Sequence, residues 1–184
     1  MNIINKQRAI LFLLVPMILV AGCSGWNPDK PNQNQSVNES DETFARFKKM
    51  DPSLNTFFDR AYGFAVFSNV GKGAIIVGGA YGKGKVYRGG RIIGSASMTQ
   101  VTVGAQLGGQ SYSELIFFKD EKAFDRFKSN KLEFDAQVSA VAAKYGGAAS
   151  ASYEDGVAVF VMTKAGLMFE ASVGGQSFSY TPNP

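Results

Sequence analysis

The sequence predicts a β-dominated α+β fold, a single antiparallel barrel-like or sandwich domain with a few short covering helices. Glycine and β-branched residues dominate after residue 62, and apolar residues alternate from Val101 through Val103 and Ala105 to Leu107, as in a half-buried strand. Candidate strands also follow one another at short spacing, without long helices between them. This spacing disfavours a doubly wound parallel sheet.

The N-terminus has the layout of a secretory signal. A short stretch with Lys6 and Arg8 precedes an apolar run over residues 9–20. The run is shorter than the roughly 20 residues that cross a bilayer as a helix, and Pro16 interrupts it. We therefore expect residues 1–22 to be a signal peptide that is removed.

The quartet Val20-Ala21-Gly22-Cys23, which contains the only cysteine of the chain, resembles the lipobox of bacterial lipoproteins. The resemblance implies that Cys23 carries a thioether-linked diacylglycerol and an amide-linked palmitate-type chain. Several chains anchor firmly, since each buried CH₂ contributes about 0.8 kcal/mol and one chain alone is marginal. Ser24 follows where lipoproteins retained at the inner membrane often carry Asp, which favours the periplasmic face of the outer membrane. The alternative is an ordinary secretory signal, with Cys23 left as an unmodified thiol.

Composition excludes several classes of function. Loss of residues 1–22 lowers the formal charge from +4 to +2, and this weak excess does not predict a nucleic-acid binder. The chain has no histidine, and acylation would use its only cysteine. Cys/His zinc sites, histidine-assisted nucleophiles and internal disulfides are therefore excluded, and we expect a non-enzymatic protein without metal or cofactor.

The polar stretch at residues 24–40 predicts a flexible tether, so we assign residues 23–40 to the lipidated N-terminus and tether, and residues 41–184 to the folded domain. Two short helices are expected next. Phe44 and Phe47 share a face of the first. Asp51 can cap the second, whose apolar residues recur at helical spacing: Leu54, Phe57, Phe58 and Ala61.

Further strands are expected at residues 64–68, 74–81, 85–87, 91–95, 114–119, 134–142, 157–163 and 167–173. The pair Gly89-Gly90 predicts a tight hairpin turn, and a helix capped by Asp120 interrupts the series. A turn is also expected at Glu154-Asp155-Gly156. Residues 115–118 and 157–162 are apolar at successive positions. Their strands should be buried on both faces, so helices must cover part of the sheet.

Glycine pairs recur within the expected strands, at Gly78-Gly79, Gly108-Gly109 and Gly174-Gly175. Such pairs are typical of bends or bulges where a sheet curls. Because glycine has no side chain, these pairs could also expose backbone surface that a lipid chain or headgroup approaches closely.

An ordered series of motifs over residues 54–180 resembles the SYLF domain. The motifs are Tyr62-Gly63-Phe64-Ala65-Val66-Phe67, Gly71-Lys72-Gly73-Ala74, Val77-Gly78-Gly79-Ala80-Tyr81-Gly82-Lys83-Gly84, residues 104–111, residues 120–127, Ala165-Gly166-Leu167 and Val173-Gly174-Gly175. The resemblance implies lipid binding, because eukaryotic members associate with phosphoinositide membranes and one branch binds actin filaments. A periplasmic location offers neither ligand. Of the family's properties, binding of phospholipid or another amphiphile is therefore the one that we expect of this chain.

Two groups of residues are candidates for membrane contact. Lys83, Lys85, Arg88 and Arg91 surround the expected hairpin and could meet anionic headgroups, although such charges also protect strand edges from pairing. The first helix, with Phe44, Arg46, Phe47, Lys48 and Lys49, could lie on lipid or pack its phenylalanines on its own domain.

A nucleotide site is not expected. Residues 79–85 have the glycine and lysine spacing of a phosphate loop, but Val86 stands where Ser or Thr should bind magnesium. The sequence therefore favours a lipid-anchored envelope protein that binds phospholipid or another amphiphile. The alternative is an envelope structural or protein-interaction module without a lipid ligand.

Overall fold

The computed structural model describes residues 33–74, 77–103, 110–132, 140–142, 144–165 and 175–184. Cys23, the expected signal peptide, the strand expected at 167–173 and most of the strand expected at 134–142 lie outside these residues. None of the helices in the described ranges is both long and apolar enough to span a bilayer.

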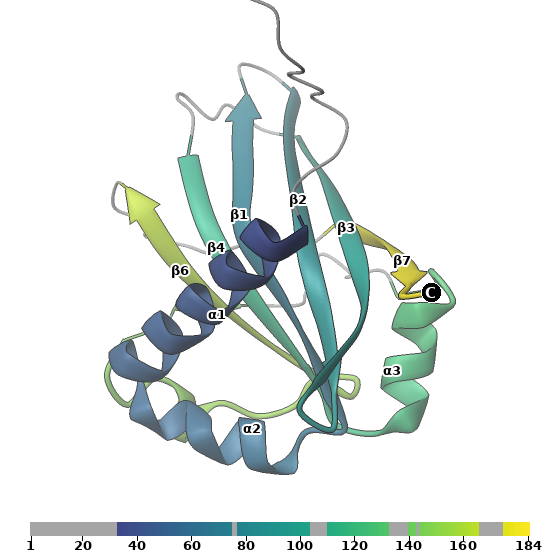
Figure 1. The fold of residues 1–184 in the computed structure, drawn as a ribbon. Helices are drawn as coiled ribbons and strands as arrows, with labels where there is room; N and C mark the ends of the chain where they lie inside the picture. Colours follow the sequence, from purple (N-terminus) through teal and green to yellow (C-terminus); the bar gives the residue numbers. More distant parts are fainter. Residues whose placement is uncertain (1–32, 75–76, 104–109, 133–139, 143, 166–174) are drawn as a thin grey trace, which may run out of the picture. The chain divides into compact units, whose positions relative to one another are not determined.

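The described residues form a seven-stranded sheet with helices on both of its faces (Figure 1). The strand order is β5-β6-β4-β1-β2-β3-β7, and every pairing is antiparallel except the parallel β5–β6 pair. The elements in chain order are α1 (Gln33–Met50), η1 (Pro52–Leu54), α2 (Asn55–Arg60), β1 (Gly63–Ala74), β2 (Val77–Arg88), β3 (Arg91–Val103), β4 (Gln110–Phe118), α3 (Glu121–Lys128), β5 (Val141–Ala142), η2 (Ala148–Ser150), β6 (Val157–Ala165) and β7 (Gln176–Pro182). The prediction of a β-dominated α+β domain with a few short helices is confirmed, in the form of one sheet whose edges are β5 and β7.

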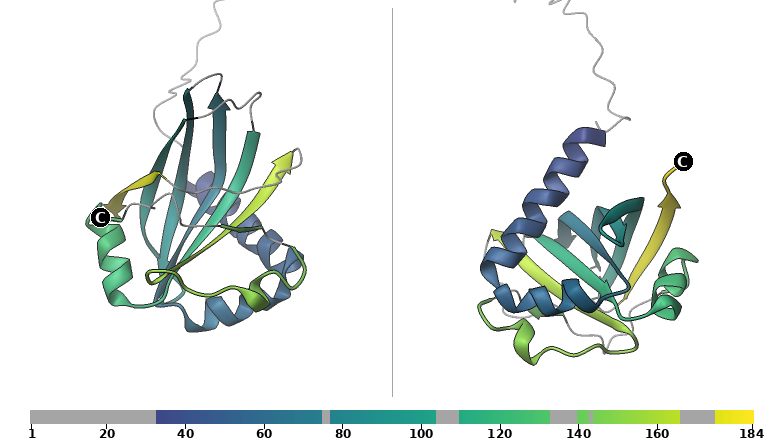
Figure 2. Two further views of the ribbon diagram at one scale, coloured as in Figure 1. Left: turned by 180° about the vertical axis from the view of Figure 1, so that it is seen from behind. Right: turned by 60° about the horizontal axis from the view of Figure 1, so that its bottom comes forward.

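The sheet has a hydrophobic cluster on each face, because its central strands are apolar at successive positions. On β4, Leu115 and Phe117 pack on one face, while Ile116 and Phe118 pack on the other. The first cluster includes residues of α1 and α2, and the second includes residues of α3. Figure 2 shows these helices on opposite sides of the sheet. The prediction that residues 115–118 and 157–162 form strands buried on both faces is thus confirmed.

Both aspartates that the sequence predicted as helix caps act as caps. The Asp51 carboxylate accepts a hydrogen bond from the Ser53 N–H at the start of η1, which leads directly into α2. The Asp120 carboxylate accepts one from the Ala123 N–H at the start of α3.

Two tight turns also agree with the sequence. Gly89 and Gly90 join β2 to β3 with φ of 56° and 73°. Asp155 and Gly156 have φ of 47° and 80°, and they form the turn that precedes β6.

Several strand boundaries differ from the prediction. The segments expected as separate strands at 64–68, 74–81 and 85–87 belong to two long strands, β1 and β2. Gly84 lies in the gap between two of these expected segments, and a Cβ on Gly84 would lie only 2.6 Å from the Val66 carbonyl oxygen. Glycine therefore permits close pairing at this position instead of ending the strand. Likewise, the strand expected at 91–95 continues to Val103, and β7 was not predicted.

The first helix is longer than expected. It begins at Gln33, so its first eight residues fall in the segment predicted as a flexible tether. Ser40 is buried, which shows that this part of the helix already packs on the domain.

Candidate functional site

The four basic residues of the β2–β3 hairpin divide between the two faces of the sheet. Lys83 and Lys85 share strand parity with Tyr87, which packs against the cluster that includes α1 and α2. Arg88 lies on the other side, where its guanidinium carbon is 4.3 Å from the centre of the Tyr62 ring. Arg91 is the cross-strand partner of Arg88 and shares its face. The predicted single basic cluster is therefore two pairs that face opposite ways.

Lys83 and Lys85 lie on a surface that we call the β2–β3 outer face. Residues that pair across two strands lie on the same face, so Ser97 and Ser95, the partners of Lys83 and Lys85, also belong to it. The next pair on this face is Tyr81 with Thr99. Its members are Tyr81, Lys83, Lys85, Ser95, Ser97, Thr99 and Val101. Two of them are large apolar or aromatic side chains that remain accessible, Tyr81 at 50% and Val101 at 67%.

The charges of this face are not neutralised by the ion pairs found in the described ranges. Those pairs join Arg126 to Asp155, Lys128 to Asp125 and Lys164 to Glu39. The outer face therefore combines accessible apolar surface, small hydroxyl side chains and two lysines.

Arg88 belongs instead to a polar contact near α3. The Tyr62 hydroxyl donates a hydrogen bond of 2.7 Å to Glu121 Oε1. This hydrogen bond raises the pKa of Tyr62, while Arg88 stacks on the ring of the same residue. A local structural contact thus accounts for Arg88.

The α1 phenylalanines face the domain, which is the second of the two arrangements that the sequence left open for this helix. Phe47 is fully buried, and the Phe44 ring lies 4.4 Å from the Phe58 ring and 5.9 Å from the Phe64 ring, centre to centre. The Lys48 ammonium lies 4.6 Å from the centre of the Phe44 ring, which draws this charge onto the same cluster. Arg46 and Lys49 remain exposed, but the phenylalanines of the same helix are turned towards the domain and do not share their exposed surface.

A corner of the molecule is built around the buried Asp51 carboxylate. Besides two contacts with Ser53, it accepts hydrogen bonds from the Gly146 N–H at 3.2 Å and the Ala148 N–H at 2.7 Å. Burial by itself would raise the pKa of Asp51, but the donors on Ser53, Ala148 and Gly146 outweigh burial and lower it. Asp51 thus joins the α1–α2 junction to the loop before β6.

The least expected polar group is Glu114, which is completely buried on β4. Its Oε2 accepts a hydrogen bond of 2.9 Å from the side-chain amide of Gln176 on β7, which is also completely buried. Burial raises the pKa of Glu114 to about 7, although the Gln176 amide partly opposes the rise. Burial, with a contribution from Glu114, also raises the pKa of Tyr112 two residues earlier.

Sequence reasoning placed Glu114 at the start of the strand expected at 114–119 and gave it no role. The signal that could have identified it is strand alternation, which places Glu114 on the same face of β4 as the buried Tyr112 and Ile116. Its partner Gln176 is 62 residues away and belongs to the strand that was not predicted.

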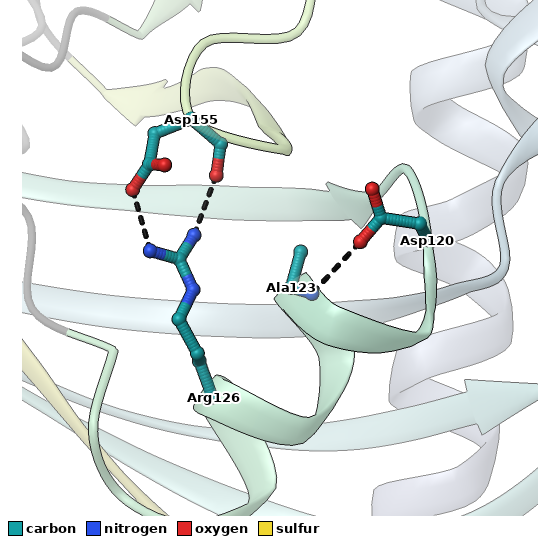
Figure 3. Close-up of polar contacts among 4 residues, drawn as sticks. All are labelled: Asp120, Ala123, Arg126 and Asp155. Carbon is teal, nitrogen blue, oxygen red and sulfur yellow. Dashed lines mark hydrogen bonds and ion pairs between the residues drawn. The ribbon is translucent and has the colours of Figure 1, made fainter.

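A surface hollow lies over α3, with charged walls that do not suit an acyl chain. It is lined by Asp120, Glu121, Lys122, Asp125, Arg126, Ser129 and Lys131. Figure 3 shows that Arg126 is held by the turn before β6, donating to the Asp155 carboxylate at 2.6 Å and to the Asp155 carbonyl at 2.5 Å. Across the described ranges, no group of three or more His, Cys, Asp or Glu side chains could hold a metal ion.

Comparison with known proteins supports the resemblance drawn from the motifs. Residues 99–182 match the family model Ysc84, described as Las17-binding protein actin regulator. The chain is also 29% identical over 142 residues to Beta cell expansion factor A of Aeromonas veronii, an alignment that covers 76% of this chain and 53% of that relative. The chain thus spans about half the length of the relative it matches. The match over residues 99–182 and the similarity to this relative both agree with a resemblance to the SYLF domain.

Proposed function

We propose that this protein is a non-enzymatic, lipid-anchored protein of the bacterial envelope whose domain binds phospholipid or another amphiphile through the β2–β3 outer face. The observation that carries the proposal is the placement of Tyr81 and Val101, both at least half exposed, on the same side of two strands as Lys83 and Lys85. Tyrosine suits the interface between lipid and water, and each lysine near an anionic surface contributes about 1 kcal/mol.

Flotation with vesicles tests the contact surface. Protein lacking residues 1–23 would be mixed with vesicles of phosphatidylcholine, with or without phosphatidylglycerol. The double variant Lys83→Glu/Lys85→Glu should lower binding to the anionic vesicles at least tenfold, since reversal of two charges costs roughly 2 to 4 kcal/mol near the surface. The loss should shrink as salt is added.

The hairpin offers a matched control. The variant Arg88→Glu/Arg91→Glu makes the same change of charge at the same hairpin, but on the opposite face, and should keep binding within about twofold. Equal losses in both variants would show that total charge, rather than the outer face, governs association. Absence of any association with either vesicle would reject the proposal.

The anchor is proposed at Cys23, on the lipobox-like quartet that ends the leader. Labelling with radioactive palmitate should mark the wild-type protein and not Cys23→Ser. After membrane fractionation, the variant should be recovered in the soluble fraction. A variant that still sediments with membranes would show that the domain, or an uncleaved leader, is sufficient for retention.

A protein-interaction module is the second candidate, because the matching family model is described by the binding of a protein, Las17. Crosslinking in cells followed by native mass spectrometry separates the two candidates. A defined protein partner without bound lipid would favour the interaction module.

A further inference from the structure

Glu114 and Gln176 meet across the concave side of the sheet, although their strands are not neighbours. Three strands, β1, β2 and β3, lie between β4 and β7 in the sheet order. In a flat sheet β4 and β7 would be about 19 Å apart, at roughly 4.8 Å per strand. Their side chains nevertheless approach to 2.9 Å, so the sheet is curled and this contact connects its two arms.

The two side chains leave one oxygen each without a hydrogen-bond partner in the described part of the chain. These atoms are Glu114 Oε1 and Gln176 Oε1, and both are acceptors while Glu114 is ionised. A proton on Glu114 Oε1 turns it into a donor, and Gln176 Oε1 belongs to the amide that already donates to Oε2 of the same carboxyl group. The protonated acid can therefore make a second hydrogen bond to the same amide, whereas the ionised form leaves a buried charge with one donor.

We propose that Glu114 and Gln176 form a protonation-dependent latch, which holds the N-terminal end of β7 against the concave side of the sheet and loosens when Glu114 ionises. The inference goes beyond the proposed function and does not depend on lipid binding.

The rest of β7 has other attachments. The Tyr180 N–H donates to Asn130 Oδ1 at 2.7 Å, and the Tyr180 hydroxyl donates to the Ile93 carbonyl at 3.0 Å. These contacts lie towards the C-terminal end of β7 and contain no titrating carboxylate. Loosening should therefore be confined to the end at Gln176.

Neighbouring groups give Glu114 no compensating charge within the described residues. Its cross-strand partners are Phe67 on β1 and Val161 on β6, and Tyr112 is the titratable group on its own strand face. On β3 and β7, the polar side chains on the same face of the sheet as Glu114 are those of Gln100 and Gln176, which are neutral amides. The pKa of about 7, which burial causes, places the change within the range of pH that an envelope protein meets.

Hydrogen exchange on the full chain in detergent micelles tests the latch. The Tyr180 N–H donates to Asn130 and so points away from β3. N–H groups alternate in direction along an edge strand, so those of Ser177 and Thr181 point towards β3. After correction for intrinsic exchange, protection at Ser177 should fall at least tenfold from pH 5.5 to pH 8.5, while protection at Thr181 changes little. In Glu114→Gln, which keeps the shape and cannot ionise, protection at Ser177 should not depend on pH. Glu42→Gln, at an exposed position of α1, should behave as wild type.

A carbon-13 NMR titration of the Glu114 carboxyl in the wild-type chain supplies a measurement that needs no variant. Titration near pH 7 together with loss of protection at Ser177 supports the latch. Constant protection at Ser177 while Glu114 ionises would overturn it, as would titration of Glu114 near 4.5.

Discussion

At the scale of single residues, two buried carboxylates have opposite electrostatic environments. Asp51 accepts hydrogen bonds from backbone N–H groups and Ser53, and these contacts lower its pKa. Glu114 has one amide donor, and burial raises its pKa to about 7. Ionisation therefore stabilises the fold at Asp51 and destabilises it at Glu114.

Asp51→Asn should reduce the free energy of unfolding at pH 7 by about 1 to 3 kcal/mol, because the backbone donors of Gly146 and Ala148 lose a charged acceptor. The pKa of Asp51 in the folded state is below its ordinary value of 3.8. The contribution of Asp51 is therefore present above that pH and is lost as pH falls through the folded pKa. Urea denaturation at pH 7 and pH 3 checks both statements, with the exposed Asp59→Asn as control. A loss that is equally large at both values of pH would contradict the charge-based explanation.

Glu114→Gln should raise the free energy of unfolding at pH 8, by an amount on the order of a few kcal/mol. In the wild type, the folded state holds the Glu114 proton between pH 4.5, the ordinary pKa of glutamate, and about pH 7, the pKa of buried Glu114. Stability should fall with rising pH across that window and level off above it. The same denaturation series should show little difference between the two proteins at pH 4. A variant less stable than wild type at pH 8 would rule out a net cost of ionising Glu114.

At the scale of elements, local signals in the sequence predicted the caps and turns, whereas strand length depended on packing between strands. Asp51, Asp120 and the Gly89-Gly90 pair act within a few residues, so their roles could be read directly. The gaps between the expected strands fall on Gly71 and Gly84, because the sequence alone does not show that strand pairing continues through a glycine.

Gly84→Ala should therefore be costly. The added Cβ would lie 2.6 Å from the Val66 carbonyl oxygen and 2.8 Å from Phe67 Cδ1, so a loss of about 1 to 3 kcal/mol is expected. Gly71→Ala is the matched control in β1, because a Cβ there meets nothing within 4 Å. Thermal unfolding would compare the two variants. Equal stabilities would show that the sheet relaxes around the added methyl group at little cost.

Phe47→Ala should destabilise the domain by about 3 to 5 kcal/mol, because it removes a fully buried ring from between α1 and the sheet. Arg46→Ala, at the neighbouring exposed position, should change stability by less than about 0.5 kcal/mol. A small effect at Phe47 would indicate that α1 is not docked in solution, and would reopen the possibility that its phenylalanines meet lipid.

At the scale of the whole molecule, the curl of the sheet determines which distant residues meet. The sequence predicted the β-dominated class and the strands buried on both faces, since both follow from local apolar patterns. It could not pair Glu114 with Gln176, because their contact depends on the curvature summed over the strands between them. It also grouped Lys83 and Lys85 with Arg88 and Arg91. Strand alternation places Lys83 and Lys85 on one side with Tyr87, and the register adds that Arg88 and Arg91 pair on the opposite face.

The central claim is that the β2–β3 outer face contacts the membrane, and a fluorescent probe on that face tests it most directly. In protein lacking residues 1–23, and hence without cysteine, Thr99→Cys places an environment-sensitive label on the outer face, and Ser129→Cys places one beside α3. Addition of anionic vesicles should shift the emission of the label at position 99 to the blue and leave the label at position 129 unchanged. A shift at position 129 alone, or at neither position despite vesicle binding, would contradict the account.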